Sequence, residues 1–199
     1  MKGSGASKRA LIFWTTALSV DEISKALQVT PADAISRFQD GRVTSWFAEI
    51  WGARLFSYKK HANTNHPGSD ASIDLGAMGP FEISVRSLTK SGIKFQKSAH
   101  IGSGRKAGQT DVEDAIASVE RVVAVDIRDF PNLTFISLDS KWLLRQSHKG
   151  IITPCGLSPA RFYDILTTEF AVKVEPFDLS LAMEVDTAAL ADKEKILAV

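Results

Sequence analysis

Two carboxylates separated by a short turn are the residues of this 199-residue chain best placed to do chemistry. The segment 69–75 alternates polar and apolar residues, 76–80 is dense in turn residues, and 81–88 alternates again. This pattern predicts a β-hairpin with Asp70 on its first strand and Glu82 on its second. Carboxylate oxygens held on adjacent strands suit Mg²⁺, a hard cation that takes one or two carboxylates and keeps several waters for substrate phosphates.

The alternation of side chains along a strand sorts the other polar residues of this hairpin. Asp74 shares a face with Asp70, and it is therefore the rival for the first metal ligand, although it leaves little room for both strand and turn. On the second strand Glu82, Ser84 and Arg86 share one face. We therefore expect Asp70, Glu82 and Asp74 as the candidate metal ligands.

A basic run follows the hairpin, and no acidic residue occurs between positions 83 and 110. The formal net charge of +1 hides this segregation of charge along the chain. Within the run, the segment 102–106 combines glycines with basic residues, which lets the backbone approach a phosphate while the cations neutralise it. The residues expected to contact DNA phosphates are Arg86, Lys90, Lys94, Arg105 and Lys106.

The remaining pattern predicts an α/β fold. An amphipathic helix over 42–56 carries Glu49, and a polar loop over 57–69 leads to the hairpin. A third strand over 93–99, a helix over 111–121 and apolar strands over 121–127 and 133–138 follow. Further helical segments are expected over 141–146 and 159–170, and a frayed tail after 182.

The N-terminal region predicts helices. The apolar run 10–18 is interpreted as a first buried helix. Ser19 and Glu22 have the spacing of a capping box, and Thr30 with Pro31 can cap and open the next helix. The segment 21–37 resembles a helix-turn-helix, and the alternative is a pair of short core helices joined by a turn.

Composition excludes several classes of protein. No apolar run approaches the ~18 to 20 residues that span a bilayer, so no membrane partner is expected. The single cysteine, Cys155, excludes an internal disulfide and fits a reducing, cytoplasmic compartment, and its neighbours Pro154 and Gly156 indicate a turn. His61 and His66 lack metal-site spacing and are interpreted as solvated loop histidines.

The order of these elements, with a glutamate on the first helix and then Asp and Glu on a hairpin, resembles the PD-(D/E)XK nuclease superfamily over residues 42–144. That family includes restriction endonucleases, junction resolvases and phage recombination nucleases. The resemblance implies an αβββαβ restriction-endonuclease-like core, a mixed sheet flanked by helices, with an N-terminal helical extension. It also implies that Asp70 and Glu82 are metal ligands and that Glu49 is an accessory acid.

One position departs from the family pattern. A lysine is expected two residues after the glutamate, and this chain has Ser84, which cannot supply a positive charge to the reacting phosphate. If the segment 89–92 is a four-residue turn, Ser84 faces Lys97 on the third strand, so Lys97 is the first candidate for the catalytic cation. Arg86 is the second candidate. The alternative is that both cations only bind phosphates, or that the site is inactive.

These observations predict a Mg²⁺-dependent endonuclease of double-stranded DNA, of the restriction type and working as a homodimer. The alternatives are a structure-selective nuclease and, from another class, a non-catalytic helix-turn-helix regulator. The expected regions are an N-terminal helical region (1–41), a nuclease core (42–146) and a C-terminal extension (147–199).

Overall fold

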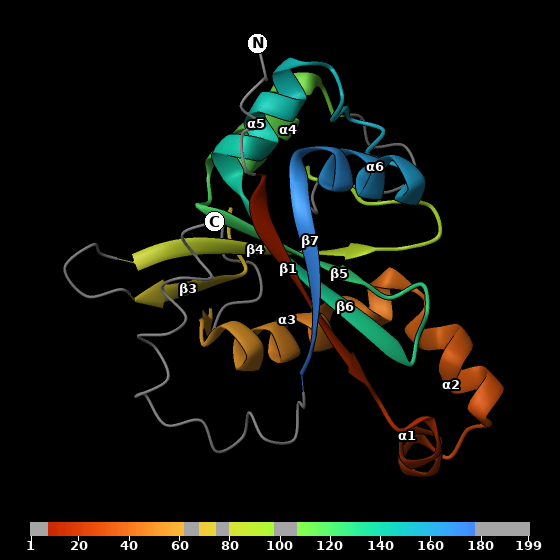
Figure 1. Ribbon diagram of the computed structural model, residues 1–199. Coiled ribbons are helices and arrows are strands. Elements are labelled where there is room, and N and C mark those ends of the chain that lie inside the picture. The colour runs from red at the N-terminus through yellow and green to blue at the C-terminus, as the bar shows by residue number, and fades with distance from the viewer. Residues whose placement is uncertain (1–7, 62–67, 75–79, 98–106, 178–199) are drawn as a thin grey trace.

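The described residues of this computed structural model form one mixed sheet of seven strands with helices on both faces (Figure 1). They comprise residues 8–61, 68–74, 80–97 and 107–177. The strand order is β2-β3-β4-β5-β6-β1-β7. The strands are β1 (Arg9–Ala17), β2 (Lys59–Lys60), β3 (Ala71–Asp74), β4 (Pro80–Leu88), β5 (Arg121–Asp126), β6 (Asn132–Asp139) and β7 (Phe170–Pro176).

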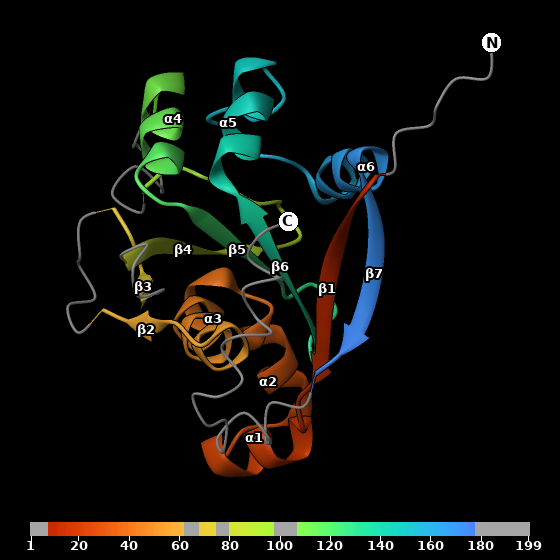
Figure 2. The ribbon, with the colours of Figure 1, turned by 60° about the vertical axis from the view of Figure 1, so that its left-hand side comes forward.

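Helices cover both faces of this sheet (Figure 2). On one face lie α1 (Val20–Leu27), α2 (Pro31–Phe38) and α3 (Gly41–Phe56), and on the other lie α4 (Gln109–Ala117), α5 (Ser140–His148) and α6 (Pro159–Glu169). The buried strand β5 contributes side chains to the hydrophobic cores on both faces of the sheet. Val123 and Val125 belong to the core under α3, whereas Val122 and Ala124 belong to the core under α4 and α6. Burial on both faces explains why β5 reads as a continuous apolar run.

The connections place the expected hairpin at the centre of an α-β-β-β-α-β order. From α3 the chain enters β2, β3 and β4, which pair antiparallel, and α4 then carries it across to β5, which is parallel to β4. The α/β class with a mixed sheet flanked by helices is confirmed. β1 and β7, from the regions on either side of residues 42–146, extend the same sheet.

The capping residues correctly predict where α1 and α2 begin. The Ser19 hydroxyl accepts the backbone N–H of Glu22, and Thr30 accepts that of Asp33, with Pro31 in the first turn. The predicted helices over 42–56 and 159–170 are α3 and α6, and the two predicted apolar strands are β5 and β6. These elements form where sequence pattern and capping agree.

The predicted helix over 10–18 is wrong, because this segment is β1. The strand lies in the interior of the sheet, antiparallel to β6 and parallel to β7. Leu11 and Phe13 enter the core under α5 and α6, while Trp14 packs against the opposite core. A strand with apolar side chains on both faces has no alternation, so it resembles a buried helix in sequence.

The predicted third strand over 93–99 is also wrong over its described part. Thr89 and Gly92 exchange backbone hydrogen bonds of 3.1 and 2.9 Å, and Ile93 then bridges to Leu157 instead of returning along β4. Gly92 has φ +108° and any Cβ there would lie 2.1 Å from the Leu157 carbonyl oxygen, so this turn requires glycine. The place expected for the third strand is taken by β5.

Candidate active site

The β3–β4 hairpin brings Asp70 and Glu82 to the same edge of the sheet. Ser72 pairs with Glu82 and Ala71 with Ile83, and the backbone N–H of Asp70 donates to the Ile83 carbonyl at 2.9 Å. Asp70 stands just before the first residue of β3, so the backbone ladder ends beside it. The antiparallel pairing of the two predicted strands is confirmed, with Glu82 on β4 and Asp70 one residue before β3 instead of on it.

The Asp70 carboxylate extends the hydrogen bonding with β4 just before β3 begins. Its Oδ2 accepts the Ser84 hydroxyl at 2.9 Å and the backbone N–H of Val85 at 2.7 Å. Ser84 therefore stands beside the acid and orients it. Within the described chain Oδ1 accepts no hydrogen bond, and that oxygen is available to a cation or to water.

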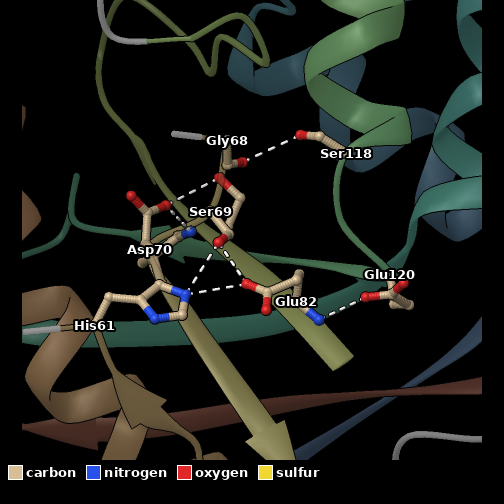
Figure 3. Close-up of polar contacts among 9 residues, drawn as sticks. His61, Gly68, Ser69, Asp70, Glu82, Ser118 and Glu120 are labelled. Carbon is tan, nitrogen blue, oxygen red and sulfur yellow. Dashed lines mark hydrogen bonds and ion pairs between the residues drawn. The ribbon is translucent and has the colours of Figure 1, made fainter. Parts of the chain in front are cut away.

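Glu82 is held by a histidine and a serine. Its Oε2 accepts the Ser69 hydroxyl at 2.5 Å and lies 3.0 Å from Nε2 of His61 (Figure 3). The Ser69 hydroxyl is also 3.0 Å from His61 Nε2, so the three side chains form a closed triangle. The backbone N–H of Glu82 donates to Glu120 at 2.5 Å, which fixes the strand beneath the carboxylate.

The interpretation of His61 as a solvated loop residue is wrong. Its side chain is 18% exposed and contacts a predicted metal ligand. The contact arises because β2 pairs with β3, and the backbone N–H of His61 then donates to the Asp70 carbonyl at 3.2 Å. No short-range spacing marks such a residue, since β2 has two residues and an intervening loop. His66 lies outside the described residues.

Glu49 joins the same neighbourhood from α3. Its carboxylate pairs with Lys60 of β2 at 2.7 Å, and its backbone carbonyl accepts the Tyr58 hydroxyl at 3.2 Å. Burial raises the pKa of Glu49, and the nearby charge of Asp70 raises it further, while Lys60 and Arg86 lower it. Glu49 therefore lies within electrostatic reach of Asp70, and its role as an accessory acid stays a prediction.

Arg86 is the cation beside these acids. Burial lowers the pKa of its guanidinium, while Asp70 and Glu49 act in the opposite direction. Within the described part of the chain its guanidinium makes no hydrogen bond or ion pair. A desolvated guanidinium with five unused donors is a strong site for an anion.

Lys97 does not have the position predicted for it. Ser84 pairs with Val122 of β5, not with a residue of a third strand, and Lys97 is an exposed residue outside the sheet. Lys97 is not opposite Ser84 because the chain crosses over from β4 to the parallel strand β5, where a hairpin was expected. Arg86 is the predicted cation that the structure brings to Asp70.

A groove of about 690 Å³ opens between the start of α3 and the end of β4. Three of the predicted phosphate contacts, Arg86, Lys90 and Lys94, line it. The other two, Arg105 and Lys106, lie outside the described residues. Three cations of the basic run thus line one groove, and one of them, Arg86, is within electrostatic reach of Asp70 and Glu49.

The donor set near the hairpin is compatible with a hard divalent cation. Asp70 and Glu82 supply carboxylate oxygens, and Mg²⁺ in proteins takes one or two carboxylates and fills its other positions with water and phosphate. No group of three or more His, Cys, Asp or Glu side chains placed to hold a metal occurs among the described residues. The side chain of Asp74 lies outside the description, so its candidacy as a ligand stays a prediction.

None of the family models, curated proteins and solved structures compared with this chain matches it. Within the described ranges, no helix combines the length and apolar character needed to cross a membrane.

Proposed function

We propose that this chain is a Mg²⁺-dependent endonuclease that hydrolyses phosphodiester bonds in double-stranded DNA. The observation that carries the proposal is the gathering of acids from separate elements around Asp70, with an unpaired arginine beside them. Glu49 comes from α3 and Glu82 from β4. Acids next to a desolvated, unpartnered cation suit a reaction in which a phosphate enters between them.

The arrangement of elements supports the same proposal. The order α3, β2, β3, β4, α4, β5 corresponds to the αβββαβ core that the resemblance to PD-(D/E)XK nucleases implies. In that family the hairpin carries the metal-binding acids and the first helix carries an accessory acid. Here Asp70 and Glu82 occupy the hairpin and Glu49 the helix.

The residues have distinct roles in this proposal. Asp70 and Glu82 would hold the cation, which would supply Lewis acidity that makes water a better nucleophile and offsets phosphate charge. Ser84 orients the Asp70 carboxylate, while His61 and Ser69 orient that of Glu82. Arg86 donates hydrogen bonds to phosphate oxygens as negative charge builds on them, the task that lysine has in the family.

Two alternative functions are a structure-selective nuclease and a non-catalytic helix-turn-helix regulator. A structure-selective nuclease uses the same site and differs only in the DNA it accepts. For the helix-turn-helix regulator, α1 and α2 with their flanks (residues 20–40) carry four acids and two basic residues, which disfavours contact with phosphates. These are Asp21, Glu22, Asp33 and Asp40 against Lys25 and Arg37. The charge distribution therefore favours the hairpin side.

The test is cleavage of a mixed-sequence DNA library by the purified chain with Mg²⁺ and with EDTA, followed by sequencing of the fragment ends. Linear duplex, four-way junction and single-stranded substrates are compared in parallel. We expect cleavage of duplex DNA in Mg²⁺ alone, with fragment ends sharing a sequence if the enzyme is of the restriction type. Cleavage that persists in a matched Asp70→Asn preparation, or absence of cleavage in all metal conditions, contradicts the proposal. The homodimer expected for paired strand cuts is tested by light scattering on the DNA complex.

A further inference from the structure

The groove beside the acids has a lining that is unusual in its chemistry. It runs from the start of α3 along the last residues of β4 to the turn that follows. Among the described lining residues three are cations, four carry hydroxyls and one is acidic, so the groove is suited to an anion with several oxygen atoms. The cations are Arg86, Lys90 and Lys94, and the acid is Asp40.

The polar groups of this groove are incompletely used within the protein. The Arg86 guanidinium has no hydrogen-bond partner in the described chain, and the buried Ser87 hydroxyl has none either. Lys90 donates to Gln39 at 3.2 Å, and the exposed Lys94 makes no ion pair with a described residue. Buried donors without partners are costly, so this hollow is stabilised when a ligand supplies acceptors.

We propose that the groove binds the sugar-phosphate backbone of one DNA strand as it leaves the cleaved phosphate. The inference rests on the proposed function and adds to it the path of the substrate. Arg86 lies at the acid end, and Lys90 and Lys94 continue the positive charge along the turn. Successive phosphates of a strand match cations arranged in this way better than one isolated phosphate does.

Two features of the lining select the backbone over other phosphate ligands. Within the described lining no aromatic side chain is present on which a base could stack, so a free nucleotide gains little from entering. The volume of about 690 Å³ is in the range of small-ligand sites, roughly 300–1,000 Å³, and is too small for a duplex. One strand enters the groove and its bases face away from it.

The experiment measures binding in EDTA, where no cleavage occurs, by the anisotropy of fluorescein-labelled oligothymidine and of a labelled duplex. The variant is Lys90→Gln/Lys94→Gln. The matched control is Lys141→Gln/Arg145→Gln, which removes the same charge from exposed positions of α5 on the opposite face of the sheet. Thermal unfolding of each variant verifies that it folds.

We expect the groove variant to bind the oligonucleotide about tenfold more weakly at 0.1 M salt, with the control unchanged. The slope of log affinity against log salt is expected to fall by about 1.4, since each neutralised phosphate of a single strand contributes about 0.7. Thymidine monophosphate and inorganic phosphate serve as competitors. The proposal requires that neither displaces the labelled strand as well as the unlabelled oligonucleotide does at equal phosphate concentration.

Equal salt slopes for the groove variant and the wild type overturn the inference, as does displacement by thymidine monophosphate at equal phosphate concentration. The first result places DNA elsewhere, and the second makes the groove a mononucleotide site. Neither depends on cleavage. If the groove variant loses binding while the wild type cuts no DNA in Mg²⁺, the groove binds a DNA strand but the nuclease proposal fails.

Discussion

Two aspartate–arginine neighbourhoods in this molecule differ in whether their charges are already satisfied. Asp126 accepts Arg128 at 2.9 and 2.7 Å and the Tyr163 hydroxyl at 2.6 Å, and the guanidinium lies 5.4 Å from the centre of the Tyr163 ring. The hydrogen bond to Asp126 is the main reason that the pKa of Arg128 is raised. Asp70 and Arg86 influence each other electrostatically but do not pair.

The difference indicates which neighbourhood is structural. A bidentate pair capped by a tyrosine leaves few donors or acceptors for a ligand, and it stabilises the link between β5 and α6. The Asp70 neighbourhood keeps an unpaired carboxylate oxygen and an unpaired guanidinium at the edge of a groove. Incomplete pairing of this kind is typical of a site that awaits a substrate.

The largest expected effect is loss of cleavage in Asp70→Asn and in Glu82→Gln. Each removes one of the two carboxylates proposed to hold the cation, and we expect the rate to fall by at least about 10³-fold, or ~4 kcal/mol of transition-state stabilisation. DNA affinity in EDTA is expected to stay or to rise, because repulsion from phosphates is removed. Single-turnover cleavage and anisotropy measure the two effects. Asp126→Asn is the control, and cleavage at the wild-type rate by either site variant refutes the metal-ligand assignment.

Arg86→Met is expected to reduce the cleavage rate by about 10²–10³-fold, the usual cost of one lost transition-state donor. Arg86→Lys is expected to recover part of this loss, because the charge returns without the planar set of donors. Single-turnover kinetics at saturating protein separates the rate from binding. Lys97→Ala is the comparison, and we expect it to cut normally. If Lys97→Ala cut no DNA while Arg86→Met cut normally, Lys97 and not Arg86 would be the catalytic cation.

Asp126→Asn tests the satisfied neighbourhood and is expected to lower the free energy of unfolding by about 2 kcal/mol. Removing one partner of a buried pair costs roughly 3–5 kcal/mol, and a lower value applies here because the Arg128 side chain is 33% exposed. Urea unfolding measures the change. Cleavage per folded molecule is expected to be unchanged, and a loss of activity without a loss of stability would show that this pair is also part of the site.

The smallest effect distinguishes the two neighbourhoods by their tyrosines. Burial raises the pKa of Tyr58 and of Tyr163, with Asp70 adding to the first and Asp126 to the second. At about pH 10.5 an ordinary tyrosine is mostly ionised. The native protein is therefore expected to show little tyrosinate absorbance at that pH, and the protein in guanidinium chloride to show that of both tyrosines.

The direction in which protein stability changes with pH follows from these raised pKa values. The folded state keeps protons that the unfolded state has lost, so stability is fully present below about pH 10 and falls as the pH rises further. Asp70→Asn is expected to lower the pKa of Tyr58 and to leave that of Tyr163 unchanged. Absorbance titration of Tyr58→Phe and Tyr163→Phe assigns each signal, and equal shifts of both tyrosines in Asp70→Asn would contradict the separation of the two neighbourhoods.

The sequence predicted features that depend on nearby residues. Alternation located the hairpin with Asp70 and Glu82, and capping residues located the starts of α1 and α2. Features that depend on distant pairing were missed. β1 has no alternation because both its faces are covered, and β7 joins it after a separation of about 160 residues.

The same distinction applies to the candidate site. Alternation along the strands placed Asp70, Glu82 and Arg86 together on the hairpin, whereas Glu49 came from the resemblance to PD-(D/E)XK nucleases. The sequence did not identify His61 as part of the site. Its contact with Glu82 depends on β2, a strand too short to leave a sequence pattern. The position of Lys97 was wrong because the turn at Gly92 is stabilised by Leu157, a residue far along the chain that no local rule includes.

The interior position of β1 has a consequence for biosynthesis. A ribosome makes this strand before the other strands of the sheet, and its neighbours β6 and β7 begin only at Asn132 and Phe170. At about 5–20 residues per second, translation takes on the order of ten seconds to deliver the second neighbour. During that interval an apolar strand with unpaired backbone groups is exposed on the nascent chain, which is the form that chaperones bind and that aggregates. The first strand of this sheet to be synthesised is thus among the last to be paired on both sides.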